Sequence, residues 1–155
     1  MITIADALTP EHVKINLNGG SFEEVLATLF ASLKNDERVD DWAALVAGLR
    51  ANPPCKVSEV AEFGICIPHA RTNAVTSMVM SAGRCESPLF LPDCDRPIRY
   101  FFCIGVPQTM AADYLRIVGA LMRLMTDPET EGSVRDAKTP GEFVSALSGL
   151  ERKLR

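Results

Sequence analysis

Residues 64–71 read Gly64-Ile65-Cys66-Ile67-Pro68-His69-Ala70-Arg71. The apolar, β-rich start of this stretch predicts a buried strand. Pro68 has a fixed φ and no amide hydrogen, and it favours extended geometry at Ile67, so we expect the strand to stop there. His69 would then lie at the end of the strand, beside a loop. The chain contains two histidines, so few side chains can change protonation near neutral pH.

Strand-like segments recur on both sides of this stretch. We expect strands at residues 13–17, 64–68, 77–83 and 98–106. The first alternates apolar and polar residues, as in a half-buried strand. The last is nearly continuous in apolar and aromatic residues, which is typical of a strand buried on both faces. Three prolines, Pro88, Pro92 and Pro97, predict an irregular connection before it.

Helix-like segments fill the intervals between the strands. Ser21 and Glu24 form a capping-box pattern that predicts a helix start, and a second helix is expected over about residues 40–49. Threonine and proline at 126–129 and 139–142 predict two short terminal helices. A helix over 111–125 would turn these apolar residues inward: Leu115, Val118, Leu121, Met122 and Met125. The alternation predicts a three-layer α/β sandwich, one domain over residues 1–155, with helices on both faces of a central sheet.

Composition restricts the classes of function. The chain is 47% hydrophobic and 23% charged, as in a globular protein, and its apolar runs are far shorter than the roughly 18 residues of a membrane span. Its formal charge of −4 argues against nucleic acid as a partner. The first six residues lack the basic start of an export signal. Five cysteines without tight pairing fit a reducing cytoplasm.

The Pro68–Arg71 run resembles the phosphorylation motif of enzyme IIA domains of the fructose/mannitol type. This is the type 2 family of the bacterial phosphoenolpyruvate-dependent phosphotransferase system, which includes nitrogen-regulatory IIA-like proteins. The resemblance extends over nearly the whole chain, and it is specific at residues 64–71 and moderate around 100–124. It implies a mixed, mostly parallel sheet and a cytoplasmic protein active in sugar transport or regulation.

The resemblance also implies a chemistry for His69. In this family the histidine accepts a phosphoryl group from the phosphocarrier protein and passes it to a IIB partner or uses it to regulate a target protein. The product is a phosphohistidine, and no cofactor is implied. Such transfer needs a neutral imidazole with one free lone pair, while an acceptor such as a backbone carbonyl holds the other nitrogen.

Several neighbouring side chains are candidates to support the transfer. Arg71 is the nearest fixed cation and Arg50 precedes the strand, while Ser58 or Thr72 offers a hydroxyl. We expect Arg71 to be a structural or partner-facing charge rather than a direct phosphate ligand. A turn at Ala70 would take it off the face that His69 occupies.

The sequence departs from the family pattern at three places. Family members usually carry a second histidine in a His-Leu pair at the start of the helix after residues 98–106, and here the pair is Tyr114-Leu115. Pro53 stands where many members have an arginine ahead of the motif. Glu62 falls in the family's glycine-rich turn, where its charge is expected to oppose an incoming phosphoryl group.

Two other readings of the site stay open. The altered support around His69 is compatible with a non-catalytic regulatory module that binds proteins through the same surface. A metal site is the third, because Cys66 and His69 have ligand-like spacing, but strand alternation directs them to opposite faces. We therefore expect no metal at this place, and we expect His12 to be a surface residue before the first strand.

Overall fold

The computed structural model describes residues 2–17, 20–51, 55–57, 62–91 and 94–151. A six-stranded sheet lies at its centre. The strands are β1 (Val13–Leu17), β2 (Cys55–Val57), β3 (Gly64–Cys66), β4 (His69–Arg71), β5 (Val79–Leu89) and β6 (Ile98–Val106). Their order is β1-β5-β6-β3-β2, and β4 also pairs with β6.

The sheet is mixed, as expected. The pairs β1–β5, β3–β6 and β4–β6 are parallel, whereas β5–β6 and β2–β3 are antiparallel. The strand that precedes Pro68 is internal, because β3 has β6 on one side and β2 on the other. The four strands predicted from the sequence are all present, while the short β2 was not predicted.

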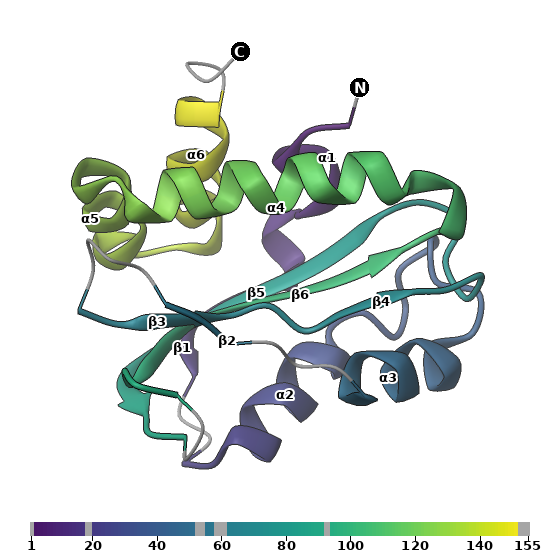
Figure 1. Ribbon diagram of the computed structural model, residues 1–155, viewed down its shortest axis with the longest axis horizontal. Coiled ribbons are helices and arrows are strands. Elements are labelled where there is room, and N and C mark those ends of the chain that lie inside the picture. The colour runs from purple at the N-terminus through teal and green to yellow at the C-terminus, as the bar shows by residue number, and fades with distance from the viewer. Residues whose placement is uncertain (1, 18–19, 52–54, 58–61, 92–93, 152–155) are drawn as a thin grey trace.

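Helices cover both faces of this sheet (Figure 1). One face carries α1 (Ile4–Ala7), α4 (Ala111–Thr126), α5 (Pro128–Asp136) and α6 (Pro140–Glu151). The other face carries α2 (Phe22–Ala31) and α3 (Trp42–Ala51). Two 3₁₀ turns, η1 (Pro10–His12) and η2 (Gln108–Met110), precede β1 and α4. The three-layer α/β architecture is therefore confirmed. Among the helices that the structure describes, none is long and apolar enough to cross a bilayer.

Alternation along β6 builds the two cores. Phe102 and Ile104 pack toward α4, and Phe101 and Cys103 pack toward α2 and α3. All four are fully buried, since β6 is central and both its faces are covered. This accounts for the unbroken apolar run that marks the strand in the sequence.

The N-caps of the helices follow short-range chemistry. The Ser21 hydroxyl accepts a hydrogen bond from the Glu24 amide at 3.2 Å and starts α2, as predicted. Thr139 accepts from the Glu142 amide in the same way at the start of α6. The N-cap of α5 is Asp127, with Pro128 at the first helical position. An unpredicted capping box at Thr3 begins α1.

Two predicted elements differ from those observed. β5 does not end near residue 83 but continues through Pro88, with an irregular register between Arg84 and Leu89 that accommodates the proline. The face of α4 is also shifted: Ile117, Leu121 and Leu124 are buried, whereas Leu115 is 70% exposed. Apolar residues occupy more than half of the circumference of α4 over residues 115–125, so periodicity alone did not determine the inward face.

The backbone around Pro68 differs from the expected strand end. β3 stops at Cys66, and a second short strand begins at His69, both parallel to β6. The Pro68 carbonyl accepts a hydrogen bond from the Ile104 amide at 2.9 Å, so the chain stays against β6 through the interruption. His69 is therefore the first residue of β4, not the last residue before a loop.

Candidate functional site

The side chain of His69 is held by its own backbone. Its Nδ1 lies 3.2 Å from the carbonyl oxygen of Ile67, the residue just before Pro68. A carbonyl oxygen only accepts, so Nδ1 carries the proton and donates it. The lone pair of the neutral ring then belongs to Nε2. The ring is partly buried, and it follows the proline interruption directly.

Tyr114 lies against this ring. The centroids of the His69 and Tyr114 rings are 5.1 Å apart, with their planes inclined by 30°. Tyr114 lies near the start of α4, so this contact brings the N-terminal part of that helix to His69. Burial raises the pKa of Tyr114, so the hydroxyl remains protonated and able to donate at neutral pH. The structure therefore places Tyr114 beside His69.

Arg71 and Thr72 follow His69 along the chain. Because β4 is extended through Ala70, alternation places Arg71 on the same face as His69, and the turn expected at Ala70 is absent. Arg71 is exposed, and no described carboxylate forms an ion pair with it. The Thr72 hydroxyl accepts a hydrogen bond from the Ala74 amide at 3.1 Å, which shapes the turn after the strand. Ser58 and Pro53 lie outside the described residues.

Arg50 belongs to the opposite layer of the molecule. Its guanidinium pairs with Glu23 and lies 5.2 Å from the centroid of the Phe30 ring, both on α2. The ring of His69 instead contacts Tyr114 of α4, on the other face of the sheet. The structure therefore does not bring Arg50 to His69, contrary to the supporting role predicted for Arg50 from the sequence. Sequence proximity was misleading because α3 covers the other face of the sheet.

Glu62 is also remote from His69. Gly64 at the start of β3 pairs with Ile98, whereas His69 pairs with Ile104, six residues further along β6. At about 3.3 Å per residue, Ile98 and Ile104 are roughly 20 Å apart along β6. Glu62 precedes Gly64 and is exposed. Glu62 is therefore too far from His69 to repel a phosphoryl group there, contrary to the prediction from the sequence.

Cys66 and His69 do not share a metal site. Cys66 packs in the core on the α2–α3 side, while the His69 ring contacts Tyr114 on the α4 side. This agrees with the alternation argued from the sequence. Within the described ranges, no three His, Cys, Asp or Glu side chains come together as ligands for a metal ion.

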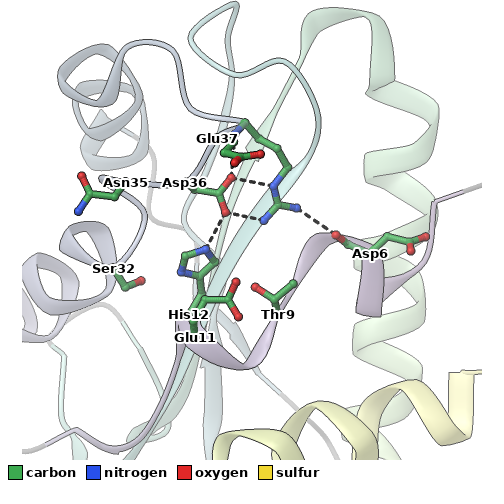
Figure 2. A pocket seen from close by; sticks show the side chains of 9 residues that line it. Asp6, Thr9, Glu11, His12, Ser32, Asn35, Asp36 and Glu37 are labelled. Carbon is green, nitrogen blue, oxygen red and sulfur yellow. Dashed lines mark hydrogen bonds and ion pairs between the residues drawn. The ribbon is translucent and has the colours of Figure 1, made fainter.

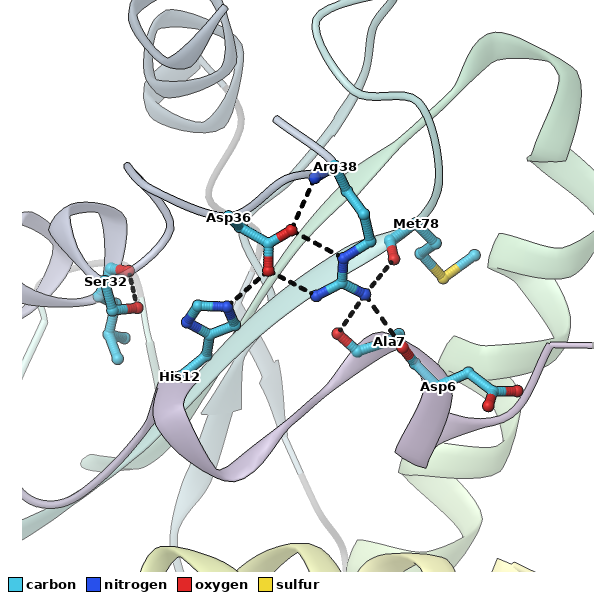
Figure 3. A network of polar contacts seen from close by, with 8 residues as sticks. Asp6, Ala7, His12, Ser32, Asp36, Arg38 and Met78 are labelled. Atoms are coloured by element: carbon cyan, nitrogen blue, oxygen red, sulfur yellow. Dashed lines mark hydrogen bonds and ion pairs between the residues drawn. The ribbon is translucent and has the colours of Figure 1, made fainter. Parts of the chain in front are cut away.

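His12 is not the surface residue expected from the sequence. It is 5% exposed, and it lines a pocket between the N-terminal segment and the connection after α2 (Figure 2). Its Nε2 lies 2.7 Å from the Asp36 carboxylate. Figure 3 shows that the same carboxylate binds the Arg38 guanidinium, at 2.9 Å from Nε and 2.8 Å from Nη2. The sequence feature that could have indicated this site is the spacing of Asp36 and Arg38, which allows the guanidinium to donate to both oxygens of the carboxylate.

The sequence matches the model of a protein family and is similar to two characterised proteins. The model of the family described as "Phosphoenolpyruvate-dependent sugar phosphotransferase system, EIIA 2" matches residues 6–149. A fructose-specific EIIA component of Haloferax volcanii is 31% identical over 103 residues, which are 66% of each chain. A nitrogen regulatory protein of Pseudomonas aeruginosa is 22% identical over 140 residues, which are 90% of each chain.

Solved structures share the fold. The nitrogen regulatory protein IIA-Ntr from Neisseria meningitidis superimposes with a TM-score of 0.76 at 19% identity, over 93% of this chain and 98% of that one. The mannitol enzyme IIA of Escherichia coli, in complex with phosphorylated mannitol enzyme IIB, has a TM-score of 0.68 at 14% identity, over 92% and 97% of the chains. From the family match over residues 6–149, the chain belongs to the EIIA 2 family of the phosphoenolpyruvate-dependent sugar phosphotransferase system.

Proposed function

We propose that the protein is a phosphoryl carrier that accepts phosphate on Nε2 of His69 from the phosphocarrier protein. It then delivers the phosphate to a IIB partner in sugar uptake, or uses its phosphorylation state to regulate a target protein. The observation that carries this proposal is the contact between Nδ1 of His69 and the Ile67 carbonyl, because it leaves the lone pair on Nε2.

The geometry fits a simple displacement. The Nε2 lone pair attacks the phosphorus of the donor's phosphohistidine; the new N–P bond forms as the donor's N–P bond breaks and the donor imidazole leaves with the electron pair. No proton needs to move, because Nδ1 keeps its own. The phosphorylated ring then carries positive charge, which the Ile67 carbonyl stabilises by accepting from Nδ1.

Nearby groups support the phosphoryl transfer. Tyr114 is close enough to His69 for its hydroxyl to donate to a phosphoryl oxygen, and it belongs to the N-terminal part of α4, whose dipole favours negative charge. Arg71 lies on the same face of β4 as His69 and is exposed, which suits contact with an acidic partner. Leu115, 70% exposed beside Tyr114, offers an apolar contact for the partner protein.

The contact between Tyr114 and His69 also supports a second candidate function, a regulatory module with impaired phosphoryl transfer. Tyr114 supplies a donor but no positive charge where the family has a histidine, and the site's other expected cation, Arg50, is turned away. Removing one preorganised donor typically costs about 10²–10³ in rate. The two candidates differ in whether His69 becomes phosphorylated at all.

The deciding experiment supplies phosphoenolpyruvate, enzyme I and the phosphocarrier protein to the purified chain. We expect one phosphate per chain, labile in acid and stable in base. The chain's two histidines provide a matched pair of variants. His69→Ala should abolish labelling, and His12→Gln should retain it. Absence of labelling in the parent protein, with a known family member labelled alongside, would remove the carrier proposal and favour the regulatory module.

A further inference from the structure

Arg71 lies on the same face of the sheet as His69. The residue between them, Ala70, packs in the core on the α2–α3 side. Because β4 is extended over all three residues, His69 and Arg71 both lie on the α4 side, where the His69 ring contacts Tyr114. At about 3.3 Å per residue, the Cα atoms of His69 and Arg71 are roughly 7 Å apart, which is within the reach of an arginine side chain.

The hydrogen bond made by His69 determines the direction in which Nε2 points. Its Nδ1 donates to the carbonyl of Ile67, which precedes His69 in the chain. The two ring nitrogens of an imidazole form their outer bonds in widely divergent directions. Nε2 therefore points away from Ile67, toward the side of the ring on which the chain continues to Arg71. A phosphoryl group bound to Nε2 would lie on that side.

The guanidinium of Arg71 is available for such a contact. The residue is exposed, and no carboxylate among the described residues forms an ion pair with it. Arg50, by contrast, pairs with Glu23 on the opposite face of the sheet. An arginine is charged at any physiological pH, and its planar group can donate two parallel hydrogen bonds to a phosphoryl group.

We propose that Arg71 binds the phosphoryl group carried on Nε2 of His69 and supplies the positive charge that Tyr114 lacks. The sequence favoured a different role for Arg71 because a turn was expected at Ala70, but β4 is extended there. The guanidinium stabilises the negative charge of the phosphoryl oxygens while the new N–P bond forms, and it then holds the phosphoryl group in place. This inference rests on the proposed phosphorylation of His69.

Two phosphoryl donors distinguish contact with the phosphoryl group from contact with a partner protein. One donor is the phosphorylated carrier protein, and the other is phosphoramidate, a small molecule without a protein surface. With phosphoramidate, the bond from Nε2 to phosphorus forms as the P–N bond of the donor breaks, and the protonated nitrogen of the donor leaves as ammonia with the electron pair.

The variants of Arg71 are compared with both donors. Arg71→Gln should slow the labelling of His69 by at least about tenfold with either donor. Arg71→Lys keeps the charge but loses the paired hydrogen bonds, so it should recover part of the rate. Arg123→Gln removes another exposed cation, in the last turn of α4, and should leave both rates unchanged.

The phosphorylated protein gives a readout that a purely structural role of Arg71 would not change. A cation beside the phosphoryl group favours its dianionic form and so lowers the pKa of that group. In a ³¹P NMR titration, we expect this pKa to be roughly half a unit higher in Arg71→Gln than in the parent protein or in Arg123→Gln. Circular dichroism spectra of the variants check that the fold is retained.

The outcomes separate this inference from the proposed function. Slower labelling of Arg71→Gln by the carrier alone would show that Arg71 contacts the partner protein, and it would overturn the inference. Unchanged rates and an unchanged phosphoryl pKa would also overturn it, while the carrier function would stand. Labelling of His69 by phosphoramidate but not by the carrier would overturn the carrier function, and a slower reaction of Arg71→Gln would still support the role of Arg71. No labelling of His69 by either donor would overturn both.

Discussion

The ring of Tyr114 rests on the ring of His69, with 5.1 Å between centroids and 30° between planes. The contact joins the start of α4 to the start of β4, two elements that the sheet topology brings to the same end of β6. It places a neutral hydroxyl-bearing side chain, not a second imidazole, beside the proposed phosphoryl acceptor. The chemistry of the site therefore depends on what residue 114 can donate.

Tyr114→His should raise the rate of phosphoryl transfer to His69. The second imidazole adds a donor that also carries charge when protonated, and one preorganised donor is worth about 10²–10³ in rate. We expect a gain of at least about tenfold, measured as the initial rate of labelling from the phosphorylated carrier. Tyr114→Phe keeps the stacked ring but loses the hydroxyl, so it should slow transfer. Equal rates in all three proteins would show that residue 114 does not contact the phosphoryl group.

Gly48→Ala should destabilise the protein although alanine is the better helix former. A Cβ at Gly48 of α3 would lie 2.8 Å from the Cβ of Ala70, next to His69 in β4. The helix gains about 1 kcal/mol of propensity, but overpacking typically costs about 1–3 kcal/mol. Gly149→Ala in α6 has nothing within 4 Å of its new Cβ and should instead raise the melting temperature. Thermal unfolding of both variants measures the difference.

Asp36→Asn should cost about 3 kcal/mol of unfolding free energy at pH 7, since it leaves the Arg38 guanidinium without its carboxylate. The Arg38 side chain, by hydrogen bonding, holds the pKa of Asp36 far below its ordinary value of 3.8. This contribution is present above the unfolded-state pKa and is lost as pH falls below about 4. The difference between parent and variant in urea unfolding should therefore shrink in acid. Asp136→Asn, at an 81% exposed side chain, should change little at any pH.

Tyr100→Phe should destabilise the protein by about 1–3 kcal/mol, because it removes a donor from a buried carboxylate. The hydroxyl of Tyr100 on β6 donates to the carboxylate of Glu131 on α5 at 2.7 Å, and both residues are buried. Burial raises the pKa of Tyr100, so its contribution is present below the unfolded-state pKa and is lost as pH rises above about 10. Denaturant unfolding at pH 7 and above pH 10 measures both effects. Tyr114→Phe, whose hydroxyl binds no described group, is the matched control for stability.

The central part of the fold could be predicted because each signal was local. The apolar run 98–106 marks the buried strand β6, and the Ser21–Glu24 cap starts α2 where expected. The inward face of α4 could not be predicted in this way, because apolar residues surround much of the helix. Leu115 is exposed there since Ile117, Leu121 and Leu124 face the sheet.

In the candidate site, too, the local features could be predicted from the sequence and the long-range ones could not. His69 and Tyr114 were predictable as neighbours from the family motif, and the tautomer of His69 follows from a contact two residues away. Arg50 and Glu62 were misplaced because distance along the chain does not reveal the face or the end of a sheet. The burial of His12 depends on Asp36, 24 residues away, and a lone histidine gives no sign of such a partner.

The bonds made by Arg38 have a consequence for the lifetime of the folded state. One guanidinium joins carbonyls of Asp6, Ala7 and Met78, which lie 31 to 40 residues away along the chain. These bonds form only when α1 and the start of β5 are already in place, so they are expected to be absent from the transition state for folding. Interactions of that kind slow unfolding and leave the folding rate almost unchanged. We therefore expect the bonds of Arg38 to lower the unfolding rate and so to lengthen the lifetime of the folded protein.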